Sequence, residues 1–296
     1  MQVGYDVIYF IYQFLVSTSF LILAALGMAI IYGMMDITNM AQGEFMMLGA
    51  YTTVLLVNRA GCPFVLAVLC GTVVTALFGG LCDRLIIRRL YGRTLDSIVV
   101  TWGISIILQQ LIYILFGPDL EGISTPFGSF KIGSVSYSVY RIMLIGIAVV
   151  LVLGFYLLFK LTKFGLHSRA TMQNREIASA FGVNTYKINS LTFMLGSALA
   201  GLVGSLYAPL MGITPTMGTN FLTESFVTVV VGGANPLAGT VLAGTGLGLV
   251  EGTLSIFYGT FIGRIGILLI AILSIRVLPN GFSGLVERNS IRRKRR

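Results

Sequence analysis

The sequence predicts an all-α fold: a polytopic transmembrane bundle of about eight to nine helices, with one or two broken or re-entrant segments. Hydrophobic residues make up 56% of the 296 residues and charged residues only 10%, whereas a soluble domain is about a quarter charged. Mean hydropathy is +0.90. The apolar runs are continuous, which favours helices over barrel strands. This composition excludes a soluble enzyme, a nucleic-acid-binding domain and a disordered regulator.

Nine apolar segments follow one another along the chain, and each is expected to form a helix. They cover residues 8–34, 43–57, 63–82, 95–116, 141–160, 188–212, 222–232, 237–257 and 261–278. The second and the seventh are short for a membrane crossing, so they are the candidates for broken or re-entrant segments. The first is too long for a signal-peptide core and no basic stretch precedes it, so we expect an uncleaved helix.

Basic residues gather in three segments, 83–94, 160–187 and 276–296, which hold sixteen of the 20 Lys and Arg residues. Cytoplasmic loops of membrane proteins carry such an excess. The three segments, with a net charge of +13 against +1 on the opposite side, are therefore expected in the cytoplasm. This places the N-terminus outside and the C-terminus inside, with an odd number of crossings. The basic tail 285–296 is expected beside anionic lipid rather than on nucleic acid.

Two polar interruptions, 34–44 and 232–239, separate apolar runs. Asn39 and Gln42 have the spacing of a helix-capping pair, so a helix is expected to restart near residue 40. The first interruption is either an ordinary cytoplasmic loop or a partly buried break, which needs protein or a water-filled cavity around it. Asn39 and Asn235 each precede a glycine by four residues. Paired breaks of this kind indicate an internal repeat with a pathway between its halves.

Polar side chains within the apolar segments are the candidates for a solute pathway. Glu44 and Glu224 each begin an apolar run, where a carboxylate suits the positive end of a helix. Gln109 lies seven residues after Trp102 and therefore on the same helix face. A membrane amide either bonds another helix or lines a polar route. The candidate pathway residues are Asn39, Gln42, Glu44, Trp102, Gln109 and Asn235.

The basic segment 160–187 is predicted to contain a short helix, Gln173 to Phe181, ended by Gly182. Such a helix either docks against another protein or lies on lipid headgroups. Its start is strongly polar, with the sequence Gln173, Asn174, Arg175 and Glu176. This polarity favours docking, because an interfacial helix needs one large apolar face.

Several absences narrow the chemistry. One histidine, His167, and three scattered cysteines do not make a standard metal site. The chain has no G-x-x-x-x-G-K-[ST] phosphate loop, and neither a Ser/His/Asp nor an HExxH constellation. We therefore expect no catalytic residue, no metal and no cofactor. The remaining classes are a permease that depends on a partner, a passive channel or ion-coupled carrier for a small polar solute, and a membrane scaffold.

Several stretches resemble a known family. GMMDITNMAQGEFMMLGAYTT (33–53), SFVTVVVGGANPLAGTVLAGTGLG (225–248) and LPNGF (278–282) are similar to the branched-chain amino-acid type of ABC importer permease, over essentially the whole chain. LYGRTLDSIVVTWGISIILQQ (90–110) and TMQNREIASAFGV (171–183) resemble the urea branch of that family, its first membrane subunit.

The resemblance implies that residues 1–296 form a single permease domain in the bacterial inner membrane. The chain would pair with a second permease subunit in a heterodimer. Two cytoplasmic ATPase subunits would bind the ATP, and an extracytoplasmic binding protein would deliver the solute. Segment 160–187 would be the cytoplasmic coupling loop, with Gln173, Asn174, Arg175 and Glu176 at the ATPase contact.

The resemblance also implies a cargo, which we expect to be urea or a short amide. A small neutral solute is recognised by amides, hydroxyls and aromatic faces, and Asn39, Gln42, Trp102, Gln109 and Asn235 supply such groups. The alternative is the same fold importing branched-chain amino acids. Glu44 and Glu224 leave that option open, because a zwitterion is bound by charges or helix ends.

Overall fold

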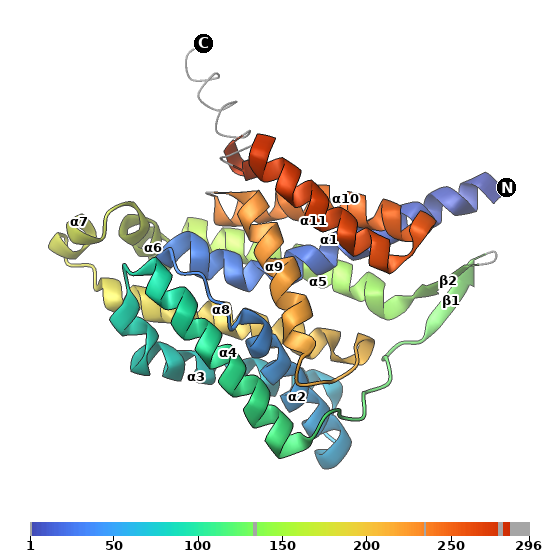
Figure 1. Cartoon of the computed structure of the whole chain (residues 1–296), viewed down its shortest axis with the longest axis horizontal. Helices are drawn as coiled ribbons and strands as arrows, with labels where there is room; N and C mark the ends of the chain where they lie inside the picture. Colours follow the sequence, from blue (N-terminus) through green and yellow to red (C-terminus); the bar gives the residue numbers. More distant parts are fainter. Residues whose placement is uncertain (1, 133–134, 234, 278–280, 285–296) are drawn as a thin grey trace, which may run out of the picture. The chain divides into compact units, whose positions relative to one another are not determined.

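The computed structural model describes residues 2–132, 135–233, 235–277 and 281–284 (Figure 1). It consists of two compact units, each built from separate stretches of the chain. The first unit comprises residues 1–25, 125–152 and 224–296. The second unit comprises residues 26–124 and 153–223.

Each of the nine apolar segments is a helix. They are α1 (Gln2–Met35), α2 (Gln42–Ala60), α3 (Phe64–Leu85), α4 (Thr94–Phe116), α5 (Val139–Leu161), α8 (Thr185–Tyr207), α9 (Met217–Gly232), α10 (Pro236–Tyr258) and α11 (Thr260–Val277). Within the described residues, seven of these helices are long and apolar enough to cross a membrane. The other two are α2 and α9, the segments that the sequence marked as short. The prediction of an all-α polytopic protein is confirmed, with seven candidate crossings among the nine helices.

Smaller elements connect the long helices. The connectors are the 3-10 helices η1 (Ile87–Leu90) and η2 (Ala208–Leu210), the helices α6 (Lys163–Gln173) and α7 (Arg175–Ala180), and the strands β1 (Ser129–Ile132) and β2 (Val135–Ser138). The two strands pair antiparallel, with Phe130 opposite Tyr137. These two rings stack with centroids 5.7 Å apart, and Tyr12 of α1 packs edge-on against Tyr137. Aromatic contacts therefore hold the hairpin against α1 within the first unit.

Glycine contacts build the core of the second unit, where α8 packs against both α2 and α3 (Figure 1). A Cβ at Gly204 of α8 would collide with the Met46 carbonyl of α2, and one at Gly49 of α2 would collide with the Gly201 backbone. Ser205 Oγ donates a hydrogen bond to the Gly49 carbonyl at 3.0 Å. Small residues allow this backbone approach in lipid, where helices associate through close packing.

Glycine contacts also recur in the first unit. A Cβ at Gly248 of α10 would collide with Thr18 of α1, and Ser225 Oγ of α9 donates to the Ala24 carbonyl at 2.8 Å. α10 and α11 pack together, and Gly259 between them has a φ of +87°. Glycine adopts this left-handed conformation without steric cost, which allows the sharp turn between the two helices.

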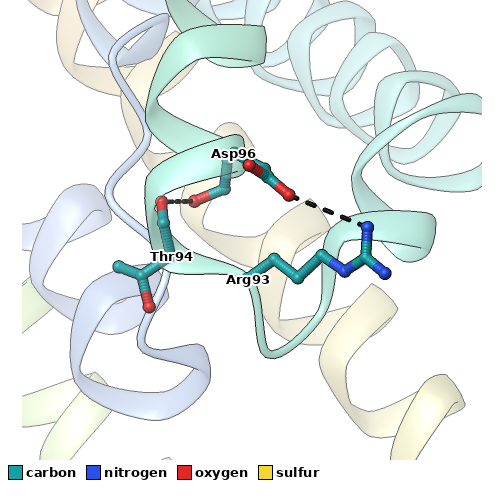
Figure 2. Close-up of polar contacts among 4 residues, drawn as sticks. Arg93, Thr94 and Asp96 are labelled. Atoms are coloured by element: carbon teal, nitrogen blue, oxygen red, sulfur yellow. Dashed lines mark hydrogen bonds and ion pairs between the residues drawn. The ribbon is translucent and has the colours of Figure 1, made fainter.

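Polar contacts order the start of α4 at the surface of the second unit (Figure 2). Ser97 Oγ donates to the Thr94 carbonyl at 2.6 Å, and Arg93 Nη1 lies 3.8 Å from Asp96 Oδ2. Asp96 sits in the first turn, where the positive end of the helix dipole favours a carboxylate. Both charged side chains are more than half exposed, so this ion pair is a surface contact.

Candidate functional site

The interruption between α1 and α2 is non-helical backbone with a buried centre. Asp36 has a left-handed φ of +54°, and Asn39 is fully buried. Asn39 Oδ1 accepts a hydrogen bond from the Ala41 N–H at 3.1 Å, and its Nδ2 donates to Gln42 Oε1 at 3.4 Å. The Asn39 side chain thus organises this turn. α2 begins at Gln42, two residues later than the sequence predicted.

Helix α4 supplies a partner for this non-helical backbone. The Met40 N–H donates to Thr101 Oγ1 at 3.0 Å, and Thr101 Oγ1 lies 2.7 Å from the Ser97 carbonyl that accepts its proton. Thr101 is itself fully buried. Backbone at membrane depth survives when protein surrounds it and satisfies its polar groups. Of the two alternatives left open by the sequence, the structure therefore fits the buried break.

Glu44 is a fully buried carboxylate in the first turn of α2. Gln109 Nε2 of α4 donates to Glu44 Oε1 at 2.7 Å, across 65 positions of sequence. Among the described residues, Glu44 Oε2 has no hydrogen-bond partner. A carboxylate is stabilised by the positive helix end and by this charge-assisted bond, but its second oxygen still requires a cationic or donor group. The described residues supply no such group to Glu44 Oε2.

Gln42 lies two positions before Glu44 and faces a different neighbour. It is fully buried, and its Nε2 has no partner in the described part of the chain. A Cβ placed at Gly27 of α1 would lie 2.5 Å from that nitrogen. Between the two polar residues, Gly43 is in backbone contact with Gly218 of α9. The four amide and carboxylate residues thus form two pairs at the start of α2, Asn39 with Gln42 and Glu44 with Gln109.

The other two pathway candidates lie apart from these pairs. Trp102 is on α4, but it is 61% exposed, and no hydrogen bond among the described residues joins it to the buried pairs. Asn235 belongs to the first unit, where it is the N-cap of α10 and its Oδ1 accepts from the Ala238 N–H at 3.2 Å. Asn235 thus orders a helix start, as Asn39 orders the turn before α2. The pathway role of all six residues stays a prediction.

Segment 160–187, which the resemblance assigns to coupling, contains the two helices α6 and α7, where a single short helix was predicted. Gln173 is the last residue of α6, and Asn174 is extended, with φ −157° and ψ 110°. Asn174 Oδ1 then accepts from the Ile177 N–H at 3.0 Å and caps α7. An asparagine that caps a following helix leaves helical geometry itself, which divides the segment. Gly182, with a φ of +83°, follows α7 as expected.

The four polar residues 173–176 differ in their surroundings. Gln173, Asn174 and Glu176 are exposed, whereas Arg175 is partly buried. Two apolar side chains that the sequence analysis did not select are also exposed, Ile177 at 55% and Phe181 at 85%. An exposed phenylalanine beside a capped helix is a contact suited to a protein partner. Phe181 directly precedes Gly182, the glycine that was predicted to end the helix, and this position was the sequence signal that could have identified it.

A second buried carboxylate has a partner that sequence reasoning missed. Glu224 Oε1 lies 3.3 Å from Arg264 Nε, so α9 and α11 are joined by an ion pair in the first unit. The Glu224 side chain is 8% exposed and that of Arg264 is 49% exposed. Glu224 is in the middle of α9, which corrects the expectation that it begins a helix. No signal in the sequence links residues forty positions apart on different helices.

Comparison with known proteins places the chain in a family. The family model described as "Branched-chain amino acid transport system / permease component" matches residues 10–278. The chain belongs to this family. It is therefore a permease component. Membership of this family and the seven long apolar helices among the described residues are consistent with a multi-pass protein of the bacterial inner membrane.

Full-length relatives agree with this assignment. The chain is 28% identical to a probable branched-chain amino acid transport permease protein of Methanocaldococcus jannaschii, over 92% of this chain and 90% of the relative. It is 26% identical to a high-affinity branched-chain amino acid transport system permease protein of Escherichia coli K12, over 90% and 91%. A Pseudomonas aeruginosa permease protein described in the same words is 27% identical, over 77% and 80%. No solved structure matches the chain significantly.

These relatives are transport components, and membership of an ABC permease family implies ATPase and substrate-binding partners. Their names favour the amino-acid branch. They give no support to the closer relationship with the urea branch that was inferred from residues 90–110 and 171–183. Within the described residues, no group of three or more His, Cys, Asp or Glu side chains is placed to hold a metal ion.

Proposed function

We propose that this chain is one of two permease subunits of an ATP-driven importer for branched-chain amino acids. The observation that carries the proposal is the family match over residues 10–278, together with relatives of that description along nearly the full length. In this proposal two ATPase subunits bind the ATP and dock on the segment 160–187, and an extracytoplasmic protein delivers the amino acid.

The geometry around Glu44 supports an amino acid as cargo. Its Oε2 is buried and without a partner among the described residues, so it is an acceptor that a ligand could use. An amino acid carries an ammonium group that can donate to this oxygen, and a hydrogen bond between charged groups is about twice as strong as a neutral one. In this role Gln109 orients the carboxylate from α4.

Urea is the second candidate, and the amides favour it. Asn39, Gln42 and Gln109 are neutral, and Gln42 Nε2 is a buried donor without a partner in the described residues. Such a donor suits the carbonyl oxygen of urea, whose N–H groups would in turn meet Glu44. The two candidates therefore use the same residues and differ in the charge of the ligand.

Competition uptake separates the two cargoes. The chain is assembled in liposomes with its second permease, its ATPases and its binding protein, and uptake of radiolabelled leucine and of radiolabelled urea is measured with ATP. We expect leucine uptake that unlabelled leucine, isoleucine and valine suppress and that urea leaves unchanged. Urea uptake without leucine uptake would instead select the second candidate.

The partner requirement is tested in the same system. Liposomes with this chain alone, or with the full assembly and no ATP, should take up neither solute, because the chain has no phosphate loop of its own. Uptake by the chain alone would establish a passive channel or ion-coupled carrier. Absence of uptake in the full assembly with ATP would leave only a scaffold.

A further inference from the structure

A cluster of aromatic and charged side chains lies where α3, η1, α7 and α8 meet, all within the second unit. Asp83 in the last turn of α3 is fully buried. Tyr91, just after η1, donates its hydroxyl proton to Asp83 Oδ1 at 2.5 Å. Burial, followed by this hydrogen bond and the charge of Asp83, raises the pKa of Tyr91 well above its ordinary value. The phenol therefore remains a proton donor at any physiological pH.

Arg175 of α7 contacts two aromatic rings of this cluster. The rings of Tyr91 and Tyr186 stack, with centroids 6.0 Å apart and planes 24° apart. The Arg175 guanidinium carbon lies 5.4 Å from the Tyr91 centroid and 4.6 Å from that of Tyr186. Arg88 approaches Tyr186 from η1 at 4.9 Å. Arginine stacks on aromatic faces through its planar, delocalised cation, so these contacts hold Arg175 in place.

The contacts form a continuous connection from the membrane helix α3 to α7. Asp83 belongs to α3, Tyr91 joins it to the ring stack, and Arg175 is the first residue of α7. Hydrogen bonds and packed side chains of this kind carry a displacement from one element to another. Glu176, Ile177 and Phe181, by contrast, are exposed.

We propose that Asp83, Tyr91, Tyr186 and Arg175 form a latch that fixes α7 to the end of α3, so that the two move together during transport. Arg175 is then a positioning residue inside the permease, and the contact with the ATPase is made by the exposed residues Glu176, Ile177 and Phe181. The assignment rests on the proposed function, since it gives the segment 160–187 its ATPase partner. Of the neighbouring polar residues, Arg175 then packs inside the permease, whereas Glu176 faces the ATPase.

The first test measures the latch in the full-length chain, in lipid nanodiscs, by hydrogen–deuterium exchange over residues 171–183. Tyr91→Phe removes the hydroxyl that reaches Asp83 and keeps the ring. Arg175→Lys keeps the charge and removes the planar face. Each variant should raise amide exchange in α7 about fivefold or more, because local opening becomes easier when such contacts are lost. Exchange at the wild-type rate in both variants would overturn the latch.

The matched control is Tyr156→Phe on α5. Tyr156 also receives a cation over its ring and a hydrogen bond at its hydroxyl, both from Lys160, at 5.2 Å and 3.0 Å. It belongs to the same unit but is exposed and lies outside the latch. This variant should leave exchange in residues 171–183 unchanged. A rise equal to that of Tyr91→Phe would show a general effect of tyrosine substitution and would also overturn the latch.

The second test measures coupling in the full assembly in liposomes. Tyr91→Phe and Arg175→Lys should retain ATPase binding and ATP hydrolysis, while uptake per ATP hydrolysed falls about tenfold. The first variant loses the hydrogen bond to Asp83 and the second loses the planar stacking contact with the two rings. Phe181→Ala should instead weaken ATPase binding in a pull-down. Loss of ATPase binding in Arg175→Lys would make Arg175 a docking contact and overturn the proposal. Failure of the wild-type assembly to hydrolyse ATP would refute the proposed function alone, because the exchange test does not depend on it.

Discussion

At the scale of single residues, the site depends on buried polar groups whose partners come from distant positions. The sequence selected Glu44 and Gln109 correctly as polar residues inside apolar helices, but their contact joins α2 to α4 across 65 positions. Composition and periodicity report which residues share one helix face, not which helices are neighbours. For the same reason the sequence did not reveal the ion pair of Glu224 with Arg264 or the stacking of Arg175 on Tyr91.

Glu44→Gln tests the charge of the candidate pathway. The variant keeps the shape and can still accept a hydrogen bond from Gln109, but it removes the negative charge offered to an ammonium. A hydrogen bond to a charged group contributes about 1.5–3 kcal/mol, so the KM for leucine uptake should rise about tenfold to a hundredfold. Gln110→Leu is the control, because Gln110 is exposed on the next position of α4. An unchanged KM in Glu44→Gln would remove this carboxylate from the pathway.

Arg264→Gln tests the ion pair between α9 and α11. It leaves the buried Glu224 without its cation, and we expect a loss of about 1–2 kcal/mol, less than for a fully buried pair because Arg264 is half exposed. This loss of stability is measured as a lower thermal midpoint of unfolding in detergent. The double variant Glu224→Gln with Arg264→Gln should recover most of the loss, as a coupled pair requires.

The surface pair at the start of α4 is the comparison for this ion pair (Figure 2). Arg93 Nη1 lies 3.8 Å from Asp96 Oδ2, and the two side chains are 72% and 56% exposed. Exposed pairs contribute between about 0 and 1 kcal/mol. Arg93→Gln should therefore leave the thermal midpoint nearly unchanged. A shift as large as that of Arg264→Gln would show that burial is not what distinguishes the two pairs.

At the scale of elements, hydropathy predicted the long helices well, because crossing length and continuous apolar runs are local properties of the chain. The strands β1 and β2 were missed, since they are held by aromatic contacts with α1, which lies far away in sequence. The division of the coupling segment at Asn174 was also missed. An asparagine in a polar run is compatible with a helix start or a helix interior, and only its capping bond decides between them.

The packing of α2 against α8 gives a prediction at this scale. Gly204→Ala places a methyl group against the Met46 carbonyl, so the helices must separate, and overpacking of this kind costs about 1–3 kcal/mol. Gly154→Ala on α5 is the matched control, because its Cβ would meet nothing within 4 Å. We expect a lower thermal midpoint for the first variant and an equal or higher one for the second. Equal midpoints in both variants would contradict a tight α2–α8 contact.

At the scale of the whole molecule, the placement of charge depends on the number of crossings. Nine and seven are both odd, so either number puts the two ends of the chain on opposite sides of the membrane. Nine crossings put segments 83–94 and 160–187 on the same side as the C-terminal end of α11, as the sequence predicted, whereas seven crossings, without α2 and α9, put them on the opposite side. The basic segments 83–94 and 160–187 flank the ends of α3, α5 and α8. The family was also visible in the sequence, but the cargo was not, since relatives of one fold bind different solutes at a few side chains.

Cysteine labelling tests the orientation. The three native cysteines are replaced by serine, and Lys131→Cys or His167→Cys is introduced. A membrane-impermeant maleimide on intact cells should label position 131, on the outer side, and should reach position 167 only after permeabilisation. This follows from the excess of positive charge expected in the cytoplasm. The reverse pattern would invert the topology and remove the coupling segment from the ATPase side.

The glycine contacts among α2, α3 and α8 also constrain how the permease can move. Where two backbones touch without intervening side chains, as at Gly49 with Gly201, a small shift produces a collision instead of a new rotamer. We therefore expect these three helices to behave as one rigid block through a transport cycle. The hinges must then lie at its edges, in non-helical joints such as the turn at Asn39 and the extended residue Asn174. Conformational change would be produced by rotation of the block rather than by sliding of its helices.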